Sequence, residues 1–144
     1  GVSSFCGAAA ALKAEYTLPN VSQTVILTRM EGRTPVPEKE QIEALAAHGA
    51  TMVIFLSAGQ LERLSARLIS GGYAPETPAA IVYKATWPDE KVIRTTVKDL
   101  AAAAAREGVT KTALITVGGF LGDEYDRSKL YDPSFTTGFR EASR

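Results

Sequence analysis

The chain has 144 residues, 45% of them hydrophobic and 22% charged, and its 16 Lys and Arg residues balance its 16 Asp and Glu residues. A chain of this size can bury a substantial core, so this ordinary composition disfavours disordered, collagen-like and disulfide-rich classes. The formal net charge of zero provides no field for a nucleic-acid backbone, so we expect no nucleic-acid partner. The uncharged stretch at residues 1–12 is shorter than a membrane span and has no basic leader, so we expect no membrane association.

Helix and strand patterns alternate along the chain. In order, they predict a helix at residues 5–16, a strand at 23–29, a helix at 37–48, a strand at 51–56, a helix at 61–70, two strands at 78–85 and 91–97, a helix at 98–107 and a strand at 111–117. Ser3 or Ser4 is predicted to cap the first helix, and Ser57-Ala-Gly-Gln60 resembles a capping box for the third.

The turn between the strands at 78–85 and 91–97 indicates how these two strands pair. Residues 86–90, which join the runs at 78–85 and 91–97, contain Pro88 and Asp89 where a tight turn favours them, so we interpret this segment as an antiparallel hairpin. Together, five strands and four helices predict an α/β (α+β) fold, a two-layer-type sandwich with a mixed five-stranded sheet and about four helices.

Nucleophilic and metal chemistry find little support in the sequence. The single histidine, His48, is placed at a predicted helix end and is interpreted as a partly exposed capping residue. The single cysteine, Cys6, lies among small helical residues and is interpreted as a packed, inert thiol. Without a Ser-His-Asp arrangement or paired His or Cys spacing, no metal site is predicted and no catalytic residue is assigned.

Small residues follow three of the predicted strands, at Leu56–Gly59, at Ala85–Thr86 and at Val117–Gly122. These residues can mark turns with unusual backbone angles, or places where a flat ligand lies against the backbone. Under the second interpretation, the three strand ends together form one adenosine-sized slot.

Basic side chains at Arg29, Arg33 and Lys84 lie in or beside strands and loops. Solvated surface charge is the ordinary explanation. The alternative is a substrate rich in carboxylates, which the planar guanidinium of arginine can bind through two hydrogen bonds.

Four segments together resemble the tetrapyrrole methylase family: GVSSFCGAAAAL at residues 1–12, TVILTRMEGRTPVP at 24–37, PAAIVYKATWPDEK at 78–91 and SKLYDPSF at 128–135. The last two are similar to the branch that methylates C11 of precorrin-4 or cobalt-precorrin-4. The resemblance extends over essentially all 144 residues. The N-terminal Gly-x-Gly-Pro-Gly-Asp loop of the family does not occur in this sequence.

The resemblance implies a C-terminal domain at residues 1–144, whose N-terminal domain is absent from this chain. It implies S-adenosylmethionine, with S-adenosylhomocysteine as product, bound between the two domains of a cytoplasmic homodimer. The positions that match the cofactor contacts of the family are Ser3, Ser4, Leu56, Ala85, Thr116, Val117 and Gly118.

The implied reaction is methyl transfer to C11 of a corrin precursor in cobalamin biosynthesis. Arg29, Arg33 and Lys84 are hypothetical contacts to the acidic side chains of the tetrapyrrole. One alternative is another tetrapyrrole methylase, such as uroporphyrinogen-III C-methyltransferase. The other is a non-catalytic ligand-binding or dimerisation module when the domain is isolated.

Overall fold

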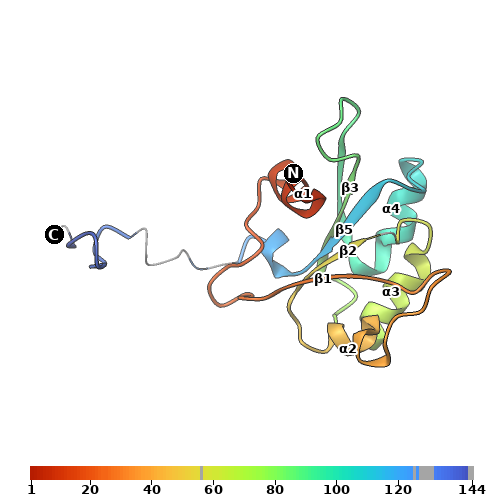
Figure 1. Cartoon of the computed structure of the whole chain (residues 1–144), viewed down its shortest axis with the longest axis horizontal. Helices are drawn as coiled ribbons and strands as arrows, with labels where there is room; N and C mark the ends of the chain where they lie inside the picture. The colour runs from red at the N-terminus through yellow and green to blue at the C-terminus, as the bar shows by residue number, and fades with distance from the viewer. Residues whose placement is uncertain (56, 125, 127–131, 143–144) are drawn as a thin grey trace.

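The computed structural model describes residues 1–55, 57–124, 126 and 132–142. These residues form one five-stranded sheet with helices on both faces, as Figure 1 shows. The strands are β1 (Val25–Arg29), β2 (Thr51–Phe55), β3 (Pro78–Tyr83), β4 (Lys91–Thr96) and β5 (Ala113–Val117). The α-helices are α1 (Ser4–Leu12), α2 (Ile42–Ala46), α3 (Leu61–Ser70) and α4 (Leu100–Arg106), with 3₁₀ turns at Glu38–Glu40, Val97–Asp99 and Gly119–Leu121. The predicted mixed five-stranded sheet with four helices is confirmed.

The strand order is β1-β2-β5-β3-β4, so the last strand in the chain lies at the centre of the sheet. β1 and β2 are parallel, and β3 and β4 form the predicted antiparallel hairpin. β5 is antiparallel to both of its neighbours, with Ile115 opposite Ile54 on one side and Ile81 on the other. As a result, the C-terminal ends of β1, β2 and β3 lie at the same end of the sheet as the N-terminal end of β5.

The two faces of the sheet are covered differently. On one face, α2, α3 and α4 enclose the larger core, whose fully buried side chains include Ile54, Leu64, Leu68, Ile81 and Ile115. On the other face, α1 covers a smaller cluster over β3 and β5 (Figure 1). Burying each large aliphatic side chain stabilises the fold by roughly 1.5–3 kcal/mol, so the first face contributes most of the stability.

A glycine sets the close approach of α2 and α3. A Cβ atom added to Gly71 would lie 2.6 Å from Cβ of Ala46 and 2.7 Å from the carbonyl oxygen of Glu43. Contacts this short are not tolerated, so the two helices can pack this closely only because position 71 has no side chain. Leu61, Leu64 and Leu68 of α3 are all buried, so one face of this helix packs into the larger core.

The predicted helix at residues 37–48 and the predicted capping box are wrong. The helix expected at residues 37–48 is split, because Gln41 has an extended backbone (φ −64°, ψ 150°) that ends the 3₁₀ turn and starts α2. The capping box at Ser57 does not form. Instead, Oγ of Ser57 donates to the carbonyl of Phe55 (2.8 Å) and accepts from the N–H of Met30 (3.4 Å), which joins the loops after β1 and β2.

Helix α1 is shorter than predicted, because Lys13 adopts a left-handed conformation (φ 53°) and ends it. Tyr16 nevertheless packs beneath the helix: its hydroxyl donates to the carbonyl of Phe5 (2.7 Å) and its ring meets Phe120 edge-on at 5.1 Å. Burial raises the pKa of Tyr16 to about 12. Cys6 is exposed, so the prediction of a packed thiol is wrong.

Leu56 and residues 128–131 of the resemblance segment lie outside the described residues. Within the described ranges, the longest helices fall short of the length and apolar content that a bilayer span requires.

Candidate functional site

A cavity of about 370 Å³ opens at the end of the sheet where β2 and β3 finish and β5 begins. Its apolar floor consists of Phe55, Val82 and Leu114, which project from β2, β3 and β5 toward the α1 side of the sheet. Residues at period two along neighbouring strands share a face, so the sheet geometry brings these three side chains together.

The rim of this first cavity comes from the segments that flank the strands. The first turn of α1 contributes Ser4, the loop after β2 contributes Ala58 and Gly59, and the turn after β3 contributes Lys84, Ala85 and Trp87. Residues 110–113 complete the rim at the start of β5, and the N–H of Lys84 donates to the carbonyl of Thr112 at 2.9 Å. This hydrogen bond continues the β3–β5 ladder and fixes the turn after β3 to the segment that leads into β5.

The first cavity brings together part of the predicted cofactor set. Ser4 and Ala85 both line it. Ser3 does not; it is the N-cap of α1, and its carbonyl accepts the N–H of Cys6 at 3.0 Å. Leu56 is outside the described residues, although its neighbours Phe55 and Ala58 line the cavity.

The predicted turn at Thr116, Val117 and Gly118 does not belong to this cavity. β5 runs antiparallel to β2 and β3, so its C-terminal end lies at the other end of the strands, away from the cavity. Thr116 and Val117 are fully buried, and the N–H of Gly118 donates to the carbonyl of Pro78 (3.0 Å). The expectation that three strand ends form one hollow is therefore wrong: two strand ends and the beginning of a third form it.

The sequence reasoning missed Trp87 and residues 110–112 as cavity residues. Nothing in the residues of β5 indicates its direction in the sheet, and that direction alone decides which of its ends meets the cavity. For Trp87 a signal was present, because the predicted hairpin turn adjoins Ala85.

Lys84 is held at the cavity rim by neighbours in its own turn. Its Nζ lies 2.5 Å from Oδ2 of Asp89, 5.1 Å from the centre of the Tyr83 ring and 5.3 Å from that of Trp87. The hydrogen bond with Asp89 raises the pKa of Lys84 and lowers the pKa of Asp89.

Arg29 and Arg33 line a second cavity, of about 330 Å³, formed largely by the loop after β1. The guanidinium of Arg29 donates to the backbone carbonyls of Met30 (3.1 Å), Thr34 (3.3 Å) and Pro35 (3.0 Å), so this side chain shapes its own loop. Arg33 is exposed on the same loop.

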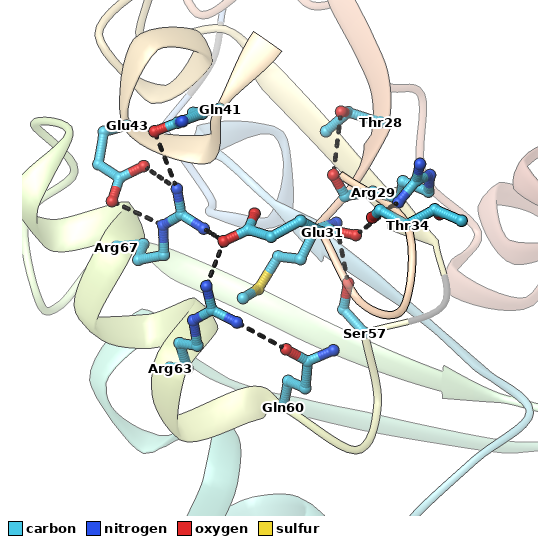
Figure 2. Close-up of polar contacts among 11 residues, drawn as sticks. Thr28, Arg29, Glu31, Thr34, Gln41, Glu43, Ser57, Gln60, Arg63 and Arg67 are labelled. Atoms are coloured by element: carbon cyan, nitrogen blue, oxygen red, sulfur yellow. Dashed lines mark hydrogen bonds and ion pairs between the residues drawn. The ribbon is translucent and has the colours of Figure 1, made fainter. Parts of the chain in front are cut away.

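An ion-pair network fixes this loop to the helices, as Figure 2 shows. Glu31 binds both Arg63 and Arg67 of α3, and Arg67 also binds Glu43 of α2 through its Nε (2.6 Å). Hydrogen bonds from Arg67 are the main reason that the pKa values of Glu31 and Glu43 are lowered and that the pKa of Arg67 is raised. No local pattern of residues indicates this network.

Comparison with known proteins identifies the class. The model of the family described as Tetrapyrrole (Corrin/Porphyrin) Methylases matches residues 1–101, about two thirds of the chain. The chain therefore belongs to the tetrapyrrole methylase family, and the resemblance found in the sequence is confirmed.

The similar relatives specify a branch of this family. The cobalt-precorrin-4 C(11)-methyltransferases of Methanocaldococcus jannaschii and Priestia megaterium are each 52% identical to this chain, over 100% and 98% of its length. The precorrin-4 C(11)-methyltransferase of Mycobacterium tuberculosis is 47% identical over 91% of it. The chain spans 56%, 56% and 53% of these proteins, respectively, so it corresponds to about half of each.

Solved structures agree in fold. The X-ray structure of cobalt precorrin-4 methyltransferase, a cobalamin biosynthetic enzyme, matches with a TM-score of 0.82 and 51% identity, over 84% of this chain and 51% of that chain. A uroporphyrin-III C-methyltransferase of Thermus thermophilus, complexed with S-adenosylhomocysteine, matches with a TM-score of 0.66 over 84% of this chain and 51% of that one. At 19% identity, the second match shows the shared fold alone.

Proposed function

We propose that this chain is the C-terminal domain of a methyltransferase that uses S-adenosylmethionine to methylate C11 of precorrin-4 or cobalt-precorrin-4 in cobalamin biosynthesis. The observation that carries the proposal is the 52% identity, over essentially the whole chain, with two cobalt-precorrin-4 C(11)-methyltransferases. The resemblance segments at residues 24–37 and 78–91 also supply much of the lining of the two cavities, which supports a role for both in the reaction.

The first cavity fits the nucleoside part of S-adenosylmethionine. Its volume of about 370 Å³ and its floor of Phe55, Val82 and Leu114 suit a flat, largely apolar ring. Ser4, Ala85 and residues 110–112 add hydroxyl and backbone groups at the rim, where the polar edge of a purine and a ribose need partners. We assign this chain's share of the nucleoside contacts to these residues.

When bound, S-adenosylmethionine supplies a methyl group already activated by its sulfonium sulfur. What remains for the protein is positioning and exclusion of water. The apolar floor excludes water from one side of the bound nucleoside, and the hydrogen bond from Lys84 to Thr112 fixes the turn after β3 to the start of β5. No described side chain is assigned as a catalytic base.

For the acidic side chains of the tetrapyrrole, Arg33 is the best candidate contact. Arg29 is engaged with three carbonyls of its own loop, and Lys84 is engaged with Asp89. The exposed guanidinium of Arg33 lies on a loop that the Glu31 network fixes, so it can bind a carboxylate without a large loss of backbone freedom.

The proposal is tested by incubating the intact enzyme with methyl-labelled S-adenosylmethionine and precorrin-4, cobalt-precorrin-4 or uroporphyrinogen III in separate reactions. We expect one label per product molecule from a precorrin-4 substrate and none from uroporphyrinogen III. Label in uroporphyrinogen III alone would assign the chain to the other branch, and label in none of the three would contradict the proposal.

Two further parts of the proposal concern partners. We propose that an N-terminal domain completes the cofactor site and that the enzyme is a cytoplasmic homodimer. Calorimetry on residues 1–144 alone tests the first part, because submicromolar affinity for S-adenosylhomocysteine would contradict the need for a second domain. Light scattering on the intact enzyme tests the second, and a monomer mass would contradict it.

A further inference from the structure

The turn between β3 and β4 carries Trp87, the single tryptophan of the chain, at the rim of the first cavity. Its side chain remains 57% exposed although it borders an apolar hollow. Tryptophan has the largest apolar surface of any side chain and usually covers most of it. The exposed indole therefore offers a flat surface to any ring bound in the cavity.

The turn is hydrogen-bonded within itself and to the wall of the cavity. The N–H of Trp87 donates to the carbonyl of Lys84 (3.0 Å), and the N–H of Glu90 donates to the carbonyl of Trp87 (3.0 Å). The N–H of Thr86 donates to Oε2 of Glu90 at 2.6 Å. With Lys84 bound to Thr112, the backbone of Trp87 is fixed relative to the start of β5, so the indole is presented without a prior ordering step.

Packing against α1 holds the turn from another side. A Cβ atom on Gly7 would lie 3.2 Å from Cγ2 of Thr86 and 3.8 Å from Cβ of Ala85, so the helix backbone approaches the turn closely. Ser4, one turn earlier in α1, lines the same cavity as Trp87. The rim is thus formed by two segments that support each other.

Lys84 contacts one face of the indole. Its ammonium lies 5.3 Å from the ring centre of Trp87 and is held in place by the carboxylate of Asp89. A cation over one face of an aromatic ring is attracted by the quadrupole of the ring. This contact occupies one face and leaves the rest of the indole available to a ligand.

We propose that Trp87 stacks on the purine ring of the nucleoside bound in the first cavity and thereby contributes affinity for the methyl donor. The purine lies between the aliphatic floor, at Val82 and Leu114, and the indole at the rim. Stacking on an aromatic side chain suits every purine face, while the backbone edges select the base. This inference rests on the proposed function and names a contact within the same site.

Calorimetry with S-adenosylhomocysteine on the intact enzyme tests the contact. We expect Trp87→Ala to weaken binding by about tenfold or more, and Trp87→Phe, which keeps an aromatic face, by less than about threefold. 5′-Methylthioadenosine, which has the base but no amino-acid tail, should lose the same factor as S-adenosylhomocysteine. Val92→Ala is the matched control, because Val92 is exposed on the same hairpin but does not line the cavity.

Fluorescence provides the second readout, because the difference between the spectra of the wild type and Trp87→Phe isolates this indole. S-adenosylhomocysteine should quench or shift that difference spectrum. If the wild type binds the probe, undiminished affinity in Trp87→Ala overturns the stacking contact and leaves the proposed function standing. A folded wild type that binds no S-adenosylhomocysteine overturns both.

Discussion

The two cavities lie at the same end of the sheet, where β1, β2 and β3 finish, but different interactions form them. The first, between α1 and the ends of β2 and β3, is formed by backbone segments and mostly apolar side chains. The second, at the end of β1, is formed by a loop whose Glu31 makes ion pairs with α3, and Arg67 of α3 is in turn paired with Glu43 of α2 (Figure 2). The shape of the first cavity thus follows from sheet topology, whereas that of the second follows from a few charged side chains.

This difference predicts different sensitivities to mutation and pH. Apolar contacts and backbone hydrogen bonds change little with pH, so the apolar floor of the first cavity should be preserved over a wide pH range. The loop after β1, which forms the second cavity, is anchored by carboxylates, and these lose their charge in acid. We call the first cavity with α1 the first region, and the loop after β1 with α2 and α3 the second region. The following predictions, from the largest expected effect on stability to the smallest, separate the two regions.

Gly71→Ala should have the largest effect, because its new methyl group would overlap Ala46 and the backbone of Glu43. We expect a loss of about 3 kcal/mol in the free energy of unfolding, measured by urea denaturation. Ser70→Ala, at an exposed neighbouring position, should change it by less than about 0.5 kcal/mol. Equal effects of the two substitutions would contradict the close packing of α2 and α3.

Arg67→Met should destabilise the second region by about 2 kcal/mol, because it leaves Glu31 and Glu43 without their shared partner. Arg63→Met is the matched control: Arg63 binds the same Glu31, but its side chain is 53% exposed against 12% for Arg67. We expect a loss below about 1 kcal/mol for the control. Affinity for S-adenosylhomocysteine should change in neither variant.

Acid should weaken the second region through the same carboxylates. The folded state lowers the pKa of Glu31 and Glu43 below their ordinary value of 4.5, so their ion pairs contribute stability above that pH. The contribution is lost as the pH falls through the lowered values. As the pH falls from 5 to 3, past the ordinary value of 4.5, the urea midpoint of the wild type should fall more steeply than that of Arg67→Met. Parallel curves would contradict a role for the network in acid sensitivity.

Tyr16→Phe tests the first region, because it removes the hydrogen bond to Phe5 at the start of α1 and keeps the ring against Phe120. We expect a loss of about 1 kcal/mol in stability. Since Ser4 adjoins Phe5, affinity for S-adenosylhomocysteine should fall by about threefold, equivalent to about 0.7 kcal/mol. An unchanged affinity would show that the start of α1 does not shape the site.

Arg33→Ala should have the smallest effect on stability, within about 0.5 kcal/mol, because the side chain is exposed. In the intact enzyme it should weaken binding of the tetrapyrrole by about tenfold, equivalent to about 1.4 kcal/mol, and leave binding of S-adenosylhomocysteine unchanged. Undiminished tetrapyrrole affinity would contradict the assignment of Arg33.

Local patterns predicted the elements well, because their signals are carried by neighbouring residues. The leucine stripe of α3 and the turn residues Pro88 and Asp89 specify structure without reference to the rest of the chain. The errors arose where distant contacts decide. Gln41 interrupts the predicted helix so that Ile42 and Ala46 can be buried, and Ser57 binds Met30, which comes 27 residues earlier.

The candidate site was predicted in part for the same reason. Ser4 and Ala85 were found from family motifs that match locally. The assignment of Thr116, Val117 and Gly118 to the same hollow required the direction of β5, which depends on strand pairing across more than 30 residues of chain. The Glu31 network was missed because its partners come from three separate segments.

The central position of β5 has a consequence for synthesis of the protein. During translation, β2 and β3 leave the ribosome before the strand that separates them, so neither can complete its hydrogen bonding until residue 117 has emerged. Until then the nascent chain carries unpaired strand edges, which are templates for misassociation. Released chains truncated before residue 113 should therefore aggregate unless a chaperone is present, and released chains that extend beyond residue 124 should be protease-resistant.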